Sequence, residues 1–299
     1  MQRMLLLVIV LLLITITNCN VVPSPLPLYN HNTHNIINRI NINTNNIKGH
    51  ITNIIKSYKT NIDSIFNIRK TSDSNNKFID NIDDDNIDAI KLLNAIISSK
   101  DGWEYVNMKD DVTVEKRFLP AGKFVDSKDA AKGSKHACIK SSGILKANAE
   151  DVYNLFLDNS RVSEYNEHCE VVKDIEYYPK KNTKIVWASS PKYGPFKARD
   201  FCSIVHYIKS PGGKYIILNR PAYHPSYPPS SKFVRATILL AANIIEPCGK
   251  NCSKLTQIAH VNPGGGADNS AIAWIINQLC AVGPPTFIRK LEKASMKKK

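Results

Sequence analysis

Residues 254–293 read KLTQIAHVNPGGGADNSAIAWIINQLCAVGPPTFIRKLEK and show two periodicities on either side of a glycine-rich corner. Residues 255–261 alternate as a strand does, and the corner Asn262-Pro263-Gly264-Gly265-Gly266 must end that strand. Residues 269–281 carry apolar side chains at helical spacing over a wide arc, which predicts a helix that covers a sheet or closes a cavity. The segment Gly283-Pro284-Pro285 interrupts this helix because proline lacks an amide donor. We therefore expect a strand followed by a hinged helix that acts as a lid.

The N-terminal part of the chain does not have the composition of a folded domain. Residues 4–14 form an apolar run behind Arg3 that is short for a bilayer span and is followed by polar residues. This pattern predicts a signal peptide over residues 1–19, with an uncleaved anchor as the alternative. Residues 20–62 contain eleven asparagines and no Asp or Glu, which indicates a low-complexity, disordered leader. We expect this leader to continue to residue 83 and the folded domain to occupy residues 84–299.

The charge of the chain restricts its partners. The net charge is +14, and from residue 89 onward 32 Lys and Arg stand against 19 Asp and Glu. Such a charge favours anionic surfaces. Nucleic acid is not an expected partner, because the basic residues are dispersed and no zinc-finger or RNA-recognition signature accompanies them. Anionic membrane headgroups are the better candidate, and a solvated basic face without a partner is the alternative.

The seven cysteines do not have the spacing of a disulfide framework. Cys248 and Cys252 are the exception, since Cys-Gly-Lys-Asn-Cys falls in an expected turn between two strands. An oxidising compartment could close this pair as a local disulfide, and the sequence alone leaves that open. A zinc site would need two further ligands that the neighbouring sequence does not supply, so neither a metal nor another cofactor is expected.

The remaining patterns predict an α+β domain. Residues 84–99 have helical periodicity behind an acidic first turn, and Asn148 is expected to cap a second helix. Four prolines make residues 221–231 a stiff loop near the strand ends. Consecutive strands joined by turns indicate one antiparallel sheet curled around a helix, a cup that side chains alone need not fill. The expected strands are residues 112–118, 136–144, 169–178, 183–188, 200–209, 214–219, 233–246 and 254–261.

Short matches along the chain are similar, in order and spacing, to one family. The chain from about Ile90 to its end resembles the START domain, the lipid-transfer domain related to the steroidogenic acute regulatory protein. The matches are Trp103, residues 112–117, residues 149–153, Arg199-Asp200-Phe201, residues 212–215, residues 234–236, residues 255–256, residues 262–265, residues 275–277 and Pro284-Pro285.

This resemblance implies a helix-grip fold whose tunnel holds one lipid and whose action is transfer or sensing without covalent chemistry. It implies a monomer whose ligand is a phospholipid such as phosphatidylcholine, with a sterol carrier as a lesser alternative. The C-terminal helix and the proline-rich loop would form the gate, with the candidate residues Tyr223, His224, Tyr227, Ile276, Pro284 and Pro285.

The resemblance also suggests lipid contacts. In the phosphatidylcholine carrier of the family, a Trp, two Tyr and an Arg hold the headgroup. Here Trp187 matches the Trp, and Phe201 and Leu239 stand at the two Tyr positions. Arg161 lies one residue from the Arg position. The sterol branch places an Arg where this chain has Val205, which favours a phospholipid. The candidate lipid-binding residues are Trp187, Phe201, Arg161, Tyr165, Arg199 and Leu239.

Two other functions and two destinations are compatible with the sequence. Enzymes share the helix-grip architecture, but no Ser-His-Asp set, nucleophile elbow or paired-carboxylate motif stands out. A sensor that binds a partner protein would use the same pocket, whereas Lys290, Lys293 and residues 297–299 beside the hinge favour release at an anionic membrane. The asparagine-rich leader resembles that of secreted apicomplexan START proteins, so we expect secretion or a vacuole such as the parasitophorous vacuole. A complex plastid is the alternative, because an acid-free stretch behind a signal also resembles a bipartite leader.

Overall fold

The structure is a computed structural model that describes residues 74–120, 122–125, 133–192, 197–268, 270–280 and 282–297. The chain divides into two compact units, residues 1–80 and 81–299, and the second is described below. The expected signal peptide and most of the leader lie outside the described residues.

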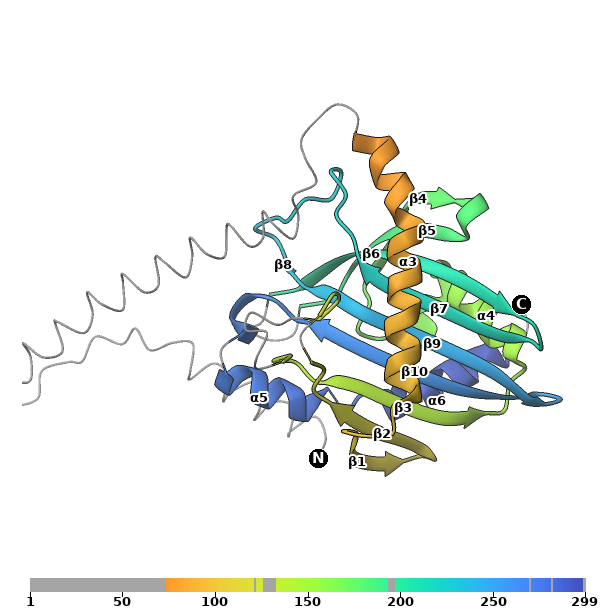
Figure 1. Cartoon of the computed structure of the whole chain (residues 1–299). Coiled ribbons are helices and arrows are strands. Elements are labelled where there is room, and N and C mark those ends of the chain that lie inside the picture. Colours follow the sequence, from red (N-terminus) through yellow and green to blue (C-terminus); the bar gives the residue numbers. More distant parts are fainter. Residues whose placement is uncertain are drawn as a thin grey trace, which may run out of the picture. The chain divides into compact units, whose positions relative to one another are not determined.

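A ten-stranded sheet forms the frame of the second unit (Figure 1). Its order is β1-β2-β3-β10-β9-β7-β6-β5-β4, with β8 paired in parallel to β6 and every other pairing antiparallel. The observed sheet confirms the expected α+β class, and it contains one strand, β1, that the sequence patterns did not predict. The bounds are β1 Glu104–Lys109, β2 Val112–Arg117, β3 Cys138–Leu145, β4 Val171–Tyr178, β5 Thr183–Ser189, β6 Arg199–Ser210, β7 Lys214–Pro221, β8 Val234–Arg235, β9 Thr237–Gly249 and β10 Cys252–Asn262.

Helices cover both faces of this sheet. In Figure 1, α3 (Ser74–Ser98) crosses the near face, whereas α4 (Ala149–Leu157) and α6 (Pro284–Ser295) lie behind the sheet. Helix α5 (Ser270–Leu279) comes directly before α6, and short 3-10 turns are η1 (Asn159–Glu164), η2 (Pro179–Lys181) and η3 (Gly265–Asp268). We call the face under α3 the outer face and the face under α4 and α6 the inner face.

Strand alternation divides the apolar core between these two faces. Along β9, Leu240 and Ile244 pack with α3 on the outer face, whereas Ile245 belongs to the inner cluster. The inner cluster also contains Ile288 and Leu291 of α6, both fully buried. Helix α6 therefore closes the inner face, as expected for the last helix of a helix-grip fold.

A buried arginine fastens α3 to the outer face. Arg220 of β7 donates from Nε to Asn86 Oδ1 at 2.8 Å and from Nη2 to the Ile82 carbonyl at 3.2 Å. Asp85 lies 3.5 Å from its Nη1, and burial lowers the pKa of the Arg220 guanidinium to about 10. Because an uncompensated buried charge is costly, these contacts fix the position of α3 on the sheet.

Local sequence signals set several element ends as predicted. The side chain of Asn148 accepts a hydrogen bond from the amide of Glu150 and caps α4. Pro284 and Pro285 occupy the first turn of α6, so the expected terminal helix is divided into α5 and α6. At the corner before η3, Gly264 has a φ of +71°, and a Cβ there would lie 2.2 Å from the Arg235 carbonyl oxygen. Only glycine allows this corner to pack against β8.

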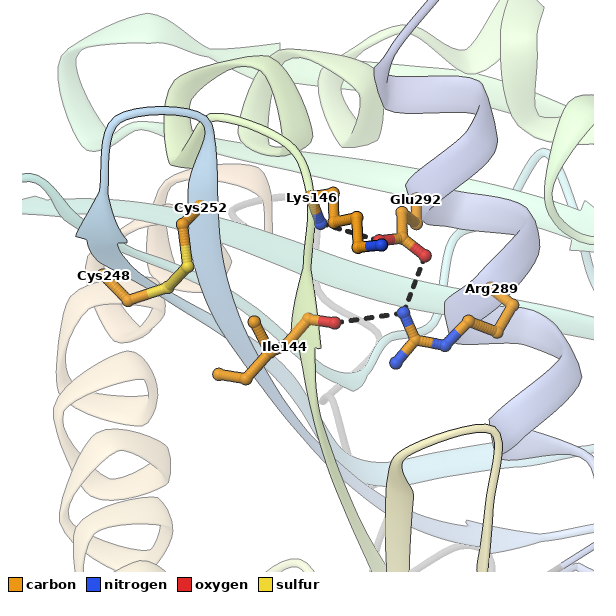
Figure 2. Close-up of a disulfide and its surroundings, with 6 residues drawn as sticks. All are labelled: Ile144, Lys146, Cys248, Cys252, Arg289 and Glu292. Carbon is orange, nitrogen blue, oxygen red and sulfur yellow. Dashed lines mark hydrogen bonds and ion pairs between the residues drawn. A yellow bond between two sulfur atoms is a disulfide. The ribbon is translucent and has the colours of Figure 1, made fainter.

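The local disulfide that the sequence left open is present. Cys248 and Cys252 join the ends of β9 and β10 across their hairpin, with 5.2 Å between the Cα atoms. Figure 2 shows this bond near the point where β3 ends and α6 is attached. The bond therefore stabilises the hairpin that continues the two central strands.

Candidate lipid-binding site

The inner face combines an apolar wall with a row of polar side chains. Ser141, Gln257 and Asn243 are direct cross-strand neighbours on β3, β10 and β9. Gln257 Nε2 donates to Asn243 Oδ1 at 2.7 Å, and the Ser141 hydroxyl donates to Gln257 Oε1 at 3.4 Å. Alternation places the row on the same face as Leu255 and Ile245 of the inner cluster. The inner face thus offers polar groups beneath an apolar cover, as an amphipathic ligand requires.

Tyr165 is the predicted lipid-binding residue most clearly placed on this face. It is buried in the inner cluster, and its ring packs edge-on against Phe156 and Phe287, with 5.7 Å between centroids in each pair. Burial raises the pKa of the Tyr165 hydroxyl, so this group stays protonated and can donate a hydrogen bond. Tyr165 therefore joins the segment after α4 to α6.

Arg161 holds the end of α6. Its Nε and Nη2 donate to the two carboxylate oxygens of Glu164 at 2.7 and 3.0 Å, and Nη2 also donates to the Ala294 carbonyl at 2.8 Å. The hydrogen bond with Glu164 raises the pKa of the Arg161 guanidinium. The candidate lipid-binding residue Arg161 is thus engaged in a link between η1 and the C-terminal end of α6.

Trp187 lies on the outer face, contrary to the expectation that it lines the tunnel. Its neighbour Val186 belongs to the inner cluster, so alternation along β5 turns Trp187 to the other side. There Nε1 donates to Asp200 Oδ2 at 3.0 Å, and the indole stacks on Tyr227 with 5.1 Å between centroids and packs edge-on against Phe233. The structure therefore joins Trp187 to the proline-rich loop.

The other candidate lipid-binding residues do not all lie on the inner face. Phe201 and Val205 lie four positions apart on β6, and alternate residues of a strand face the same side. Phe201 therefore shares the face of Val205, which belongs to the inner cluster. Leu239 falls at a bulge where pairing moves from Leu240 to Ile238, so alternation does not assign its face. Arg199 begins β6, and its Nη1 donates to the Lys197 carbonyl at 3.0 Å while burial lowers its pKa. Of this group, only Phe201 joins Tyr165 on the inner face.

An ion pair that the sequence patterns did not predict anchors the proline-rich loop. Asp200 accepts from Arg235 Nε at 2.9 Å and from Nη2 at 2.7 Å, and the same Nη2 donates to the Tyr227 carbonyl at 2.9 Å. Like Tyr227, His224 is a predicted gate residue. It is buried, and its Nε2 lies 2.8 Å from Glu176 Oε1. Tyr223, the third predicted gate residue in this loop, is exposed. No short-range spacing connects Asp200 with Arg235, so only the fold reveals this anchor.

The two terminal helices are attached very differently. Helix α6 is held by Arg289, which donates to the Asp110 carbonyl at 2.9 Å and the Ile144 carbonyl at 3.0 Å, and by Glu292, which accepts from the Lys146 amide at 2.7 Å (Figure 2). Arg289 and Glu292 also bond each other at 2.6 Å. Burial opposes ionisation of Glu292, but the Lys146 amide and Arg289 outweigh it and lower its pKa.

The polar attachment of helix α5 that the structure describes comes from Asn277. Asn277 accepts from the Ala137 amide at 2.8 Å and donates to the Lys135 carbonyl at 2.9 Å. The predicted gate residue Ile276 is half-buried beside it, whereas Trp274 has 65% of its surface exposed. Pro285 is buried and Pro284 is half-buried at the start of α6. The anchored part of the lid is therefore α6, which Arg289 and Glu292 join to the sheet.

Neither a metal cluster nor a membrane-spanning helix is found in the part of the chain that the structure describes. No group of three or more His, Cys, Asp or Glu side chains there is arranged to hold a metal ion. In the same ranges, no helix has the length and apolar character that crossing a membrane requires.

A curved antiparallel sheet that carries α4 and a closing C-terminal helix on its inner face defines the helix-grip class of α+β proteins. The model of one family, described as the START domain, matches residues 88–299. The chain therefore belongs to the START family, whose domains bind or transfer lipids.

Individual relatives support this assignment. Human START domain-containing protein 10 is 31% identical over 103 residues, which are 34% of this chain and 34% of that protein, and the mouse protein gives the same values. The matched segment thus spans about a third of these relatives. The crystal structure of human STARD10 has a TM-score of 0.58 at 22% identity and covers 69% of this chain and 78% of that one. Human StAR-related lipid transfer protein 5 has a TM-score of 0.54 at 18% identity, covering 69% and 92%. The two solved structures establish the shared fold.

Proposed function

We propose that this protein binds one phospholipid molecule against its inner face and transfers it between membranes. The observation that carries the proposal is the START match over residues 88–299, together with an inner face closed by α4 and α6. A phospholipid is favoured over a sterol because the inner position of Val205 provides no charged partner for a buried sterol hydroxyl.

The position of Trp187 bears on the choice among phospholipids. Recognition of a choline group uses aromatic faces around the cation. Trp187 is turned to the outer face and is already stacked on Tyr227, which removes the predicted aromatic contact from the inner face. We therefore propose that phosphatidylcholine is carried without strong discrimination against phosphatidylethanolamine.

The membrane contact is proposed for one end of the sheet. Lys290 pairs with Glu167 at 2.7 Å and Lys297 approaches Glu164 at 3.7 Å, so two of the C-terminal lysines are partly neutralised. At the end where β5, β7 and β10 finish, the chain carries the exposed Trp274 of α5. Three exposed lysines lie in segments at this same end, namely Lys192, Lys197 and Lys232. Tryptophan beside lysine is well suited to an anionic bilayer surface.

Other properties of this protein follow as proposals. The Cys248–Cys252 disulfide supports an oxidising compartment, in agreement with secretion or a vacuole. We propose a monomer that acts without an enzymatic step. A lipid sensor that signals to a partner protein is the second candidate, because the well-anchored α6 would suit a protein that retains its ligand.

Native mass spectrometry tests the ligand directly. The purified full chain would be incubated with vesicles that contain phosphatidylcholine, phosphatidylethanolamine and cholesterol in equal amounts. We expect one phospholipid per chain, with both phospholipid classes represented. Recovery of cholesterol alone, or of no lipid, would contradict the proposed ligand.

A further inference from the structure

Three buried tyrosines gather on the inner face beside α4. Tyr153 lies in α4, Tyr165 caps η1, and Tyr207 lies in β6, and all three belong to the inner cluster. Their exposed fractions are 3%, 6% and 8%. The rings of Tyr153 and Tyr207 meet edge-on with 6.3 Å between centroids. We call these three residues the tyrosine cluster.

The hydroxyls of the tyrosine cluster have no hydrogen-bond partner. Throughout the described ranges, the three residues make ring contacts but no hydroxyl bond. Because the three hydroxyls make no such bond and are not fully sealed, they border space that a water-sized sphere can reach. A hydroxyl that reaches such a space takes its hydrogen bonds from whatever fills it. Three of them in one cluster indicate a ligand or ordered water that completes their bonding.

Positive charge adjoins the tyrosine cluster. Lys209 Nζ lies 5.1 Å from the centre of the Tyr153 ring and 5.9 Å from that of Tyr215, which stacks on Tyr153 at 4.5 Å. Lys184 Nζ lies 5.6 Å from the centre of the Tyr207 ring, but it is paired with Asp174 at 2.9 Å. Among the described residues, Lys209 has no carboxylate within ion-pair distance. Lys209 therefore supplies a cation beside Tyr153, while the carboxylates of Asp174 and Asp158 lie near Tyr207 and Tyr165.

We propose that the hydroxyls of Tyr153, Tyr165 and Tyr207, with Lys209, bind the phosphoryl group of the carried phospholipid. Several neutral donors beside a cation complement an anion that has several acceptor oxygens. A sterol offers one hydroxyl and could not satisfy three donors. Burial raises the pKa of each of the three phenols, so all remain donors at neutral pH. This assignment rests on the proposed function and names the site of the headgroup.

Tyrosine-to-phenylalanine variants test the site because they remove the hydroxyl and keep the ring. Tyr153→Phe, Tyr165→Phe and Tyr207→Phe would be made singly and together in the full chain. Binding of a fluorescent phosphatidylcholine would be compared with binding of a diacylglycerol that has the same acyl chains and no phosphate. A hydrogen bond to a charged group is worth about 1.5–3 kcal/mol, so each variant should weaken phosphatidylcholine binding about tenfold or more. Diacylglycerol binding should be unchanged.

Stability without ligand separates recognition from packing. Because each hydroxyl lacks a partner, the three variants should unfold at the same temperature as the parent or higher when no lipid is bound. Tyr105→Phe is the control, since Tyr105 is 67% exposed on β1 and its variant should change neither property. Lower unfolding temperatures with unchanged phosphatidylcholine binding, or equal losses for both lipids, would overturn the assignment.

Two further outcomes show whether the site binds a lipid headgroup or a free phosphate compound, and which of the two proposals has failed. Inorganic phosphate or glycerophosphocholine alone should not raise the unfolding temperature. A rise with either compound would show that the site binds a free phosphate compound instead of a lipid headgroup. If the parent chain binds no lipid, the proposed function fails. If the parent binds phospholipid and the triple variant binds it equally well, only the assignment of the tyrosine cluster fails.

Discussion

At the scale of single residues, Asp200 organises the surroundings of the proline-rich loop. Its carboxylate is almost fully buried and receives Trp187 Nε1 and two bonds from Arg235. Asp200→Asn would leave the Arg235 charge without its partner. We expect the free energy of unfolding to fall by about 3 kcal/mol, measured by urea denaturation. Lys232→Gln, an exposed neighbour in the same region, should change it by less than about 0.5 kcal/mol. Equal stability of Asp200→Asn and the parent would show that the pair is not stabilising.

The same carboxylate gives a pH dependence. Burial alone would raise the pKa of Asp200, but Arg235 and Trp187 outweigh burial and hold it below the ordinary value of 3.8. A lowered folded pKa contributes stability that is present above the unfolded value and is lost as pH falls through the folded one. The stability difference between the parent and Asp200→Asn should therefore be constant near neutral pH and shrink below about pH 3.8. A difference that grows on acidification would contradict this account.

The sequence could predict which residues are aromatic or charged at the site but not which way they face. Trp187 was assigned to the tunnel because its type and approximate position match the family, and a strand turns successive residues to opposite faces. A shift of one position is enough to reverse the assignment. Leu239 escapes prediction for a related reason, since the bulge in β9 has no signal in the sequence. Arg235 was quoted only as part of a match, because its partner Asp200 is 35 residues away.

At the scale of elements, the division between α5 and α6 is the feature that matters for release. Pro284 and Pro285 occupy the first turn of α6 and prevent α5 from continuing into it. Replacing both by alanine would favour a continuous helix by up to about 3 kcal/mol for each proline. If only about 1.4 kcal/mol of this opposes opening, the transfer rate falls about tenfold. Transfer between vesicles would measure the rate, and equilibrium binding of the same lipid, which should be unaffected, is the control. An unchanged rate would refute the hinge.

The hairpin disulfide gives a second prediction at this scale. Replacing Cys248 and Cys252 by serine frees a loop of five residues, and closing so short a loop contributes about 2 kcal/mol. The unfolding temperature should fall by about 5 °C in thermal denaturation monitored by circular dichroism. A reductant should lower the parent to the same value and leave the variant unchanged. Identical unfolding temperatures with and without reductant in the parent would show that the bond does not stabilise the hairpin.

Element prediction succeeded where periodicity was strong and failed where burial was weak. The second helix, the central strands and the break at the prolines all follow from alternation, capping and proline chemistry. Strand β1 was missed because its residues are mostly exposed on both sides and show no alternation. Helix α3 begins ten residues earlier than expected, at Ser74, in a stretch whose polar composition gives no apolar period.

At the scale of the whole molecule, the fold explains why one chain can carry a lipid. The sheet has two covered faces, and α3 on the outer face and α6 on the inner face are both fixed by buried polar anchors. Helix α5 follows β10 and the proline-rich loop follows β7, so both leave the sheet at the same end. Composition and periodicity predicted the cup, but the lipid came only from the family resemblance, because apolar residues around a ligand and apolar residues around a core have the same pattern.

Transfer of labelled lipids from donor to acceptor vesicles by the purified full chain tests the central claim most directly. Phosphatidylcholine, phosphatidylethanolamine and cholesterol would be compared, with acceptor vesicles that either contain or lack an anionic lipid. We predict transfer of both phospholipids at rates well above the spontaneous rate, faster toward anionic acceptors, and little transfer of cholesterol. Failure to transfer either phospholipid, while the protein still retains one after purification, would contradict the carrier and favour the sensor.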